Sequence, residues 1–114
     1  MKLTGLENWI ISKEIVKEVW VKPAFLLAEL VDRYSKLVRK WELEDDFFSY
    51  TSNELQKNTG LSYSKQKRCL EILEKKWYIE IVVKWIPAQK YYKLNDKTFL
   101  SYKKTKNEQR YNLF

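Results

Sequence analysis

Residues 47–80 read FFSYTSNELQKNTGLSYSKQKRCLEILEKKWYIE, and this stretch decides the fold. Its first half predicts a short helix that is capped by Thr51 or Ser52 and ends near Thr59, because a hydroxyl side chain before the first turn accepts a backbone N–H. Leu55 would face inward. Gly60 follows at the position where helices commonly end in a left-handed residue, so we expect the chain to reverse there.

The second half of the stretch predicts another amphipathic helix after a turn of three residues. Ser62 or Ser64 would cap it. Five residues share one face of this helix: Gln66, Cys69, Leu70, Leu73 and Trp77. Leu55, Leu61 and Leu70 would then hold the two short helices together, which is the arrangement of a helix-turn-helix.

Two helices and a strand are expected before this stretch. Residues 12–21 form an N-terminal helix with Ser12 as its cap, and its apolar residues at helical spacing are Ile15, Val16, Val19 and Trp20. Pro23 fits the first turn of a longer helix, roughly residues 23–40. Residues 47–51 are rich in aromatic and hydroxyl side chains and predict one brief strand.

A hairpin is expected after the stretch. Residues 78–85 and 90–94 are rich in β-branched and aromatic side chains, and residues 86–89 form the turn between them. Residues 96–114 form a basic and aromatic tail. They predict either a further helix, capped by Asp96 and packed on the first helices or on another subunit, or a basic arm.

This order of elements predicts a mainly α fold with a small antiparallel β-sheet, a winged helix-turn-helix, with its core in residues 23–95. We expect residues 1–114 to form a single domain, because 45% of the residues are hydrophobic and 16% are aromatic. No apolar run approaches the length of a membrane span, and the first residues do not resemble a signal peptide. A cytoplasmic protein of a bacterial host is therefore expected.

The charge of the chain is uneven. The net charge is +7, but residues 1–59 carry nine Lys or Arg against ten Asp or Glu, whereas residues 60–114 carry thirteen against five. This asymmetry favours an anionic partner for the second half, of which nucleic acid is the commonest. A merely soluble basic surface is the alternative interpretation.

The candidate DNA-binding residues lie on the second short helix and on the hairpin. The N-terminal turns of a recognition helix contact base edges and phosphates, and here they hold Tyr63, Ser64, Lys65, Lys67 and Arg68. Near the hairpin tip, a wing could contact the DNA backbone or minor groove through Lys84, Gln89 and Lys90. A solvated helix face and an ordinary edge hairpin are the alternatives.

Catalytic and metal sites are not expected. The chain has no His and one Cys, so it lacks the commonest general base and cannot form a disulfide or a zinc site by itself. Cys69 is expected in the core, and the acidic cluster of residues 42–46 reads as a solvated loop. We therefore expect no enzyme activity, no cofactor and no metal.

Three segments carry a family resemblance: residues 47–80 quoted above, IPAQKYYKLN at residues 86–95 and PAFLLAELVDRY at residues 23–34. Together they resemble the winged-helix domains of replication initiators and replisome organisers from phages, plasmids and mobile elements of Gram-positive bacteria. The sequence departs from that family at Trp77 and Trp85, where glycine is usual, and at Gln56, where a small residue is usual. Gln66 also stands where many winged helices have an apolar residue.

The function predicted first is binding of double-stranded DNA, for transcription regulation or DNA replication. A protein-interaction module on the same scaffold is the alternative, with a host or replisome protein as partner. It is motivated by the five tryptophans, because aromatic residues concentrate at interfaces. A homodimer on two half-sites is a further expectation.

Overall fold

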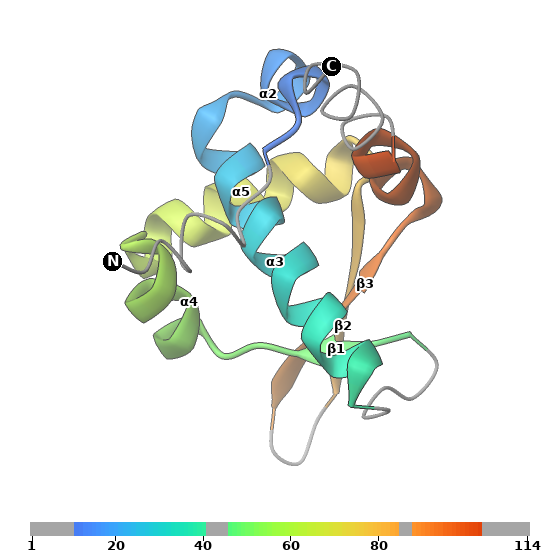
Figure 1. Cartoon of the computed structure of the whole chain (residues 1–114). Helices are drawn as coiled ribbons and strands as arrows, with labels where there is room; N and C mark the ends of the chain where they lie inside the picture. Colours follow the sequence, from blue (N-terminus) through green and yellow to red (C-terminus); the bar gives the residue numbers. More distant parts are fainter. Residues whose placement is uncertain (1–10, 41–45, 85–87, 104–114) are drawn as a thin grey trace, which may run out of the picture.

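A computed structural model describes residues 11–40, 46–84 and 88–103. Its elements are α2 (Lys13–Val19), α3 (Val21–Arg39), β1 (Phe48–Ser49), α4 (Ser52–Thr59), α5 (Tyr63–Lys75), β2 (Ile79–Lys84) and β3 (Gln89–Leu94), and residues 96–103 are helical (Figure 1). This is an α+β fold with the element order of a winged helix-turn-helix, which confirms the expected fold class.

The sheet has the order β1-β3-β2, and both pairings are antiparallel. In the hairpin Ile79 pairs with Leu94 and Lys84 pairs with Gln89, while β1 adds Phe48 opposite Tyr92. Figure 1 shows α3 crossing the molecule diagonally, with α4 to one side of it and the hairpin to the other. Helix α3 packs against α2, α4 and α5, so it is the central support of the other helices.

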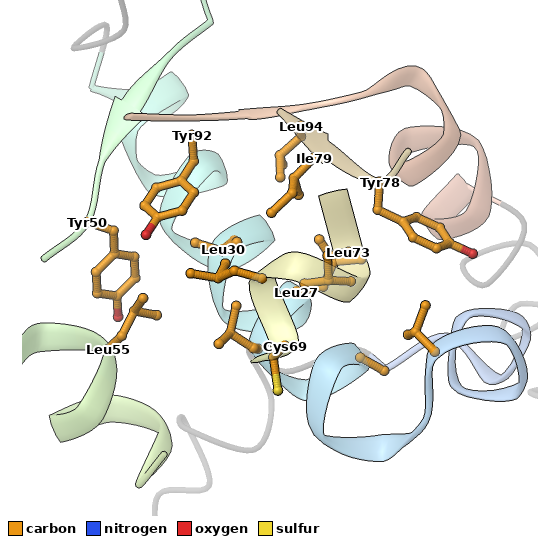
Figure 2. Close-up of a cluster of buried hydrophobic side chains, with 14 of the residues drawn as sticks. Leu27, Leu30, Tyr50, Leu55, Cys69, Leu73, Tyr78, Ile79, Tyr92 and Leu94 are labelled. Atoms are coloured by element: carbon orange, nitrogen blue, oxygen red, sulfur yellow. The ribbon is translucent and has the colours of Figure 1, made fainter. Parts of the chain in front are cut away.

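The core lies between α3, α4, α5 and the inner face of the sheet. Figure 2 shows leucines of α3, α4 and α5 together with Tyr50, which follows β1, Tyr92 of β3 and Tyr78 of the turn before β2. Its largest fully buried side chains include Leu27, Leu30, Leu55, Leu73, Tyr50, Tyr78 and Tyr92. Burial on this scale supplies most of the stabilisation of the fold, at roughly 25 cal/mol per Å² of apolar surface.

Hydroxyl caps start three of the helices, as the sequence predicts. The side chains of Ser12, Thr51 and Ser62 accept the backbone N–H of the residue three positions later, at 3.4, 3.2 and 3.5 Å. Each cap satisfies an N–H that the first helical turn leaves without an intrahelical acceptor. The structure thus selects Thr51 and Ser62 from the two pairs of alternatives that the sequence allowed, and it confirms Ser12 as the cap of α2.

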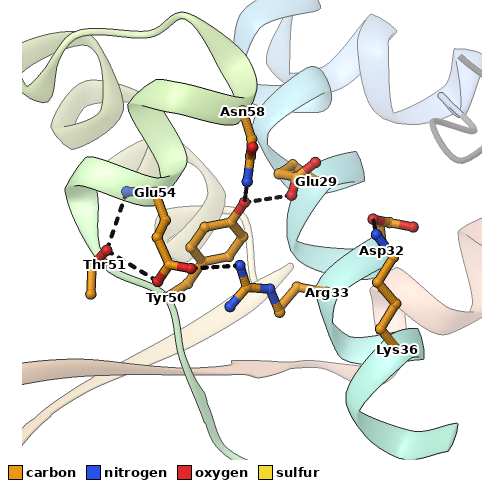
Figure 3. A network of polar contacts seen from close by, with 8 residues as sticks. All are labelled: Glu29, Asp32, Arg33, Lys36, Tyr50, Thr51, Glu54 and Asn58. Carbon is orange, nitrogen blue, oxygen red and sulfur yellow. Dashed lines mark hydrogen bonds and ion pairs between the residues drawn. The ribbon is translucent and has the colours of Figure 1, made fainter. Parts of the chain in front are cut away.

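A polar network joins α3 to the start of α4 (Figure 3). The Tyr50 hydroxyl donates to Glu29 Oε2 at 2.5 Å and accepts from Asn58 Nδ2 at 2.6 Å. The Arg33 guanidinium lies 3.9 Å from the centre of the Tyr50 ring and forms an ion pair with Glu54 at 3.0 Å. Burial raises the pKa of Tyr50 well above its usual range, so the hydroxyl keeps its proton.

A second network fastens the C-terminal helical residues. The Lys97 ammonium pairs with Glu18 at 2.8 Å, and the Tyr78 hydroxyl donates to the same carboxylate. The hydrogen bond from Lys97 is the main cause that lowers the pKa of Glu18. The Thr98 hydroxyl donates to the Tyr78 carbonyl at 2.6 Å, and the centre of the Phe99 ring lies 5.3 Å from the centre of the Tyr34 ring of α3. Residues 96–103 thus pack as a helix on α2 and α3, whereas residues 104–114 lie outside the described part.

Two tryptophans depart from the predicted helix faces. Trp77 was expected on the buried face of α5, but α5 ends at Lys75 and the Trp77 side chain is 75% exposed. Its φ of 68° turns the chain so that Tyr78 takes the inward position. Trp20 was expected within the first helix, but α2 ends at Val19, and Trp20 is 79% exposed with a φ of 76°.

Other boundaries are corrected by smaller amounts. The predicted strand 47–51 shrinks to two residues, because Tyr50 turns into the core and Thr51 caps α4. Helix α3 starts at Val21, so Pro23 is its third residue and still lies where no intrahelical N–H bond is lost. Gln89 was expected in the hairpin turn but pairs with Lys84 as the first residue of β3.

The Tyr50 network predicts a stability loss for Tyr50→Phe. Removing the hydroxyl deletes the hydrogen bonds to Glu29 and Asn58 inside the protein, which should cost about 1–3 kcal/mol of unfolding free energy. Urea denaturation measures the loss. Tyr91→Phe is the matched control, because the described residues give its hydroxyl no hydrogen bond. Equal stability of the two variants would contradict this role for the Tyr50 hydroxyl.

The backbone at Trp77 predicts an unusual result for Trp77→Gly. The N–H groups of Trp77 and Tyr78 bond to the carbonyls of Glu74 and Leu73, a helix ending that normally uses glycine. A non-glycine residue in the left-handed conformation lowers the unfolding free energy by roughly 1–2 kcal/mol. Glycine at the same position lowers it by about 0.5–1 kcal/mol, because glycine loses more chain entropy on folding. Trp77→Gly should therefore keep or raise stability, by up to about 1 kcal/mol.

Gly60→Ala is the reciprocal test. Gly60 has a φ of 78°, and an added Cβ meets no atom within 4 Å, so backbone strain alone should lower stability by about 1 kcal/mol. Thermal and urea unfolding of both variants measure the two effects. A marked destabilisation by Trp77→Gly would mean that the indole makes a stabilising contact.

Candidate nucleic-acid interface

Helix α5 has one buried face and one exposed face. Gln66, Cys69, Leu70 and Leu73 are buried against α3 and α4, and burial raises the pKa of the Cys69 thiol. The opposite face carries all five candidates that the sequence placed on this helix, and every one of them is exposed: Tyr63, Ser64, Lys65, Lys67 and Arg68. We call these five residues the α5 outer face.

One buried amide fixes the position of α5. Gln66 Nε2 donates to the carbonyl of Ser52 at 3.0 Å and to the carbonyl of Leu61 at 2.9 Å. Ser52 is the first residue of α4, and Leu61 lies in the turn, so a single side chain joins both short helices and the turn between them. An apolar residue at this position could pack there but could not make these two bonds.

The turn itself is set by Gly60 and by local hydroxyls. Gly60 adopts the left-handed conformation, and its N–H bonds to the carbonyl of Gln56 at 2.8 Å. The Thr59 hydroxyl accepts from the N–H of Leu61 at 3.2 Å. Ser62 Oγ caps α5 and lies 3.3 Å from Ser64 Oγ. The N-terminus of α5 is therefore exposed and conformationally fixed.

The hairpin brings only part of the predicted wing to α5. The Lys90 ammonium lies 5.7 Å from the centre of the Tyr63 ring, so β3 and the N-terminus of α5 meet there. Side chains alternate along a strand, which places Lys84 and Gln89 on the opposite face of the hairpin. Lys84 instead lies 4.6 Å from the centre of the Tyr91 ring on that face. Residues 86 and 87 of the predicted turn, and residue 85 at the predicted end of the first strand, lie outside the described residues.

The cations of the α5 outer face are unpaired within the described part of the chain. The ion pairs there join Arg33 to Glu54, Lys36 to Asp32 and Lys97 to Glu18, and none involves α5. Like charges so close together repel one another, and an external anion relieves this repulsion. The α5 outer face therefore has the electrostatics of an anion-binding surface.

The comparisons with known proteins give one structural match. It is the solved structure named "N-Terminal domain of DNA binding protein", with a TM-score of 0.62 and 16% sequence identity. The match covers 95% of this chain and 96% of that one. The two chains share a fold. No family model matches the sequence, and no curated protein matches it.

Other kinds of site find little support in the described residues. Among them, no group of three or more His, Cys, Asp or Glu is placed to hold a metal ion. No helix in the described ranges has the length and apolar character needed to cross a bilayer.

Sequence reasoning missed one neighbour of α5. Trp20 and Lys22, at the junction of α2 and α3, line the same hollow as Lys65 and Arg68. No local motif marks this juxtaposition, because it depends on how α3 crosses α5. The only signal was the number of tryptophans, which does not say where they meet.

The two bonds of Gln66 predict that Gln66→Leu lowers stability even though leucine suits a buried helix face. The carbonyls of Ser52 and Leu61 lose their donor, which should cost about 1–3 kcal/mol. Chemical denaturation measures this loss, and Gln56→Leu on the exposed side of α4 is the control. A Gln66→Leu protein as stable as the wild type would show that the amide does not hold the helix pair.

Proposed function

We propose that the protein binds double-stranded DNA with the α5 outer face in the major groove. The observation that carries this proposal is the exposed cationic face of a helix whose other face is fixed in the core, with no ion pair to these cations from residues 11–40, 46–84 and 88–103. The major groove admits an α-helix, and phosphates on both sides of it supply the anions. The shared fold with a domain of a DNA-binding protein is consistent with this role.

The residues of the face suit different parts of the duplex. Arg68 and Lys67 can donate to O6 and N7 of guanine, the commonest base-specific contact. Tyr63, Ser64 and Lys65 lie in the first turn of α5, where hydroxyl and ammonium groups can contact phosphate oxygens. Base contacts would then specify the sequence, and phosphate contacts would set the position of the helix.

The hairpin would act as a wing. Lys90 lies beside Tyr63 and would extend the phosphate-binding surface of α5. Lys84 and Gln89, on the other face of the hairpin, would contact backbone or minor groove only if the hairpin lies edge-on to the duplex. We therefore propose that Lys90 contacts phosphates next to α5. Lys84 and Gln89 would make the contacts of the wing that lie farther from α5.

The biological role proposed is transcriptional regulation or initiation of replication for a phage, plasmid or other mobile element, in the cytoplasm of a bacterial host. It rests on the resemblance of residues 23–95 to such winged-helix domains. We propose that the protein acts by binding alone, without catalysis. A homodimer that reads two half-sites is part of this proposal, because symmetric sites multiply specificity.

Replacing Lys65, Lys67 and Arg68 together by alanine should abolish specific binding. Arg68→Ala alone should cost roughly 1–3 kcal/mol if the guanidinium reads a guanine. The slope of log K against log salt should fall by about one for each phosphate contact that is lost. Selection from a random duplex pool would supply the site, and anisotropy titration would measure the affinities.

A charge-matched control separates this face from general basicity. Alanine at Lys13, Lys17 and Arg39 removes the same number of charges from the exposed surfaces of α2 and α3. These changes should alter binding only through net charge. Equal losses in the two triple variants would mean that the protein binds DNA without using α5.

A further inference from the structure

An apolar groove lies beside α5 where α2 meets α3. Its walls are the exposed side chains of Trp20, Val21 and Ile72, and its floor includes the buried residues Pro23 and Cys69. It has a volume of about 440 Å³, within the range of pockets that bind small ligands. It can therefore receive an aromatic or branched aliphatic side chain. We call it the Trp20 groove.

The backbone at Trp20 does not favour tryptophan. Its φ of 76° and ψ of 173° lie in a region that is essentially restricted to glycine, and the indole is 79% exposed. The residue closes α2 and precedes α3, so glycine would serve the chain better there. Neither local conformation nor burial explains the indole, whereas the apolar groove with its flanking cations is a feature of its surroundings that would.

The charges around the groove indicate the chemistry of the molecule that would bind there. Lys22, Lys65 and Arg68 line the groove, and none of the lining residues that the structure describes is Asp or Glu. A second copy of the chain docked symmetrically would oppose these cations to themselves, which is unfavourable. A duplex offers anions but keeps its bases stacked, so it has no free apolar group to insert. The occupant needs carboxylates and an apolar side chain together.

We propose that the Trp20 groove binds an acidic peptide segment of a partner protein. One apolar side chain of the segment lies in the groove against the Trp20 indole. Carboxylates on either side of it pair with the three cations of the groove. Burial of the apolar side chain gives the affinity, and the charge pattern selects acidic segments over neutral ones.

The groove shares Lys65 and Arg68 with the α5 outer face. An acidic segment in the groove therefore competes with duplex DNA for two of its contacts, a consequence that rests on the proposed function. Occupancy by the partner would release the DNA, and DNA would in turn displace the partner. The docking of the peptide itself does not depend on DNA binding.

The experiment uses a displayed library of random peptides, selected on the whole chain. Recovered peptides should be rich in Asp and Glu around a Trp, Phe or Leu. Trp20→Gly should weaken their binding by about 30-fold, a loss typical of truncating a central aromatic residue at an interface. Lys22→Glu should weaken it as well. Fluorescence anisotropy of labelled copies of the recovered peptides measures each affinity.

Trp77→Gly is the matched control. It also removes an exposed indole from a residue of positive φ, but Trp77 follows the C-terminus of α5 and does not line the groove, so the change should leave peptide affinity unchanged. Glycine suits the backbone at both positions, so both variants should fold. Selected peptides that are neutral or basic, or that bind Trp20→Gly as tightly as wild type, would overturn the proposal.

Two nucleic-acid titrations complete the test. A single-stranded oligonucleotide that binds wild type but not Trp20→Gly would assign the groove to nucleic acid and overturn the peptide proposal. Duplex DNA should bind Trp20→Gly normally and should displace the peptide from wild type. If the protein binds duplex DNA but the selection recovers no acidic peptide, only the peptide proposal for the Trp20 groove is contradicted. If acidic peptides bind in a way that requires Trp20 but no duplex DNA binds, only the proposed DNA-binding function is contradicted.

Discussion

The hydrogen bonds from one buried amide, that of Gln66, to the carbonyls of Ser52 and Leu61 are the constraint on which the orientation of the α5 outer face depends. They join the first turn of α4, the reversal after Gly60 and the inner face of α5. Because α5 is held on that face, its opposite face has to be solvent-exposed. The cations there are displayed as a consequence of how the helix is buried, and their orientation needs no further contact.

The rest of the fold supports this pair of helices through buried tyrosines. Tyr50 connects α3 to α4 through Glu29 and Asn58, and Tyr78 connects the end of α5 to Glu18 of α2. Burial raises the pKa of both hydroxyls, so they remain hydrogen-bond donors at any physiological pH. The Tyr50 hydroxyl offers the buried Glu29 carboxylate a neutral donor, whereas the exposed Glu18 carboxylate accepts from Tyr78 and also pairs with Lys97.

Much of this could be predicted from local sequence. The caps at Ser12, Thr51 and Ser62, the left-handed Gly60 and the buried face of α5 all follow from short-range rules, and the structure confirms them. Trp77 could not be placed this way, because helical periodicity does not show where a helix stops when the usual glycine is missing. Lys84 and Lys90 lie on opposite faces of the hairpin because side chains alternate along a strand, and grouping them by their nearness to the tip did not take this alternation into account.

The two positive-φ tryptophans bear on function more than on folding. A residue held in such a conformation costs of order 1–3 kcal/mol, a large part of the stability of a small domain. The backbone would accept glycine at Trp20 and Trp77 and would be relieved by it, and both side chains point to solvent. Within the part of the chain that the structure describes, neither burial nor backbone conformation accounts for these two indoles. At Trp20 a reason exists in the surroundings, since an apolar groove and three cations lie beside the ring and two of those cations belong to the α5 outer face. Under the two proposed functions, the strain is the cost of keeping an aromatic contact beside the helix proposed to bind DNA, so that a peptide partner and DNA would exclude each other.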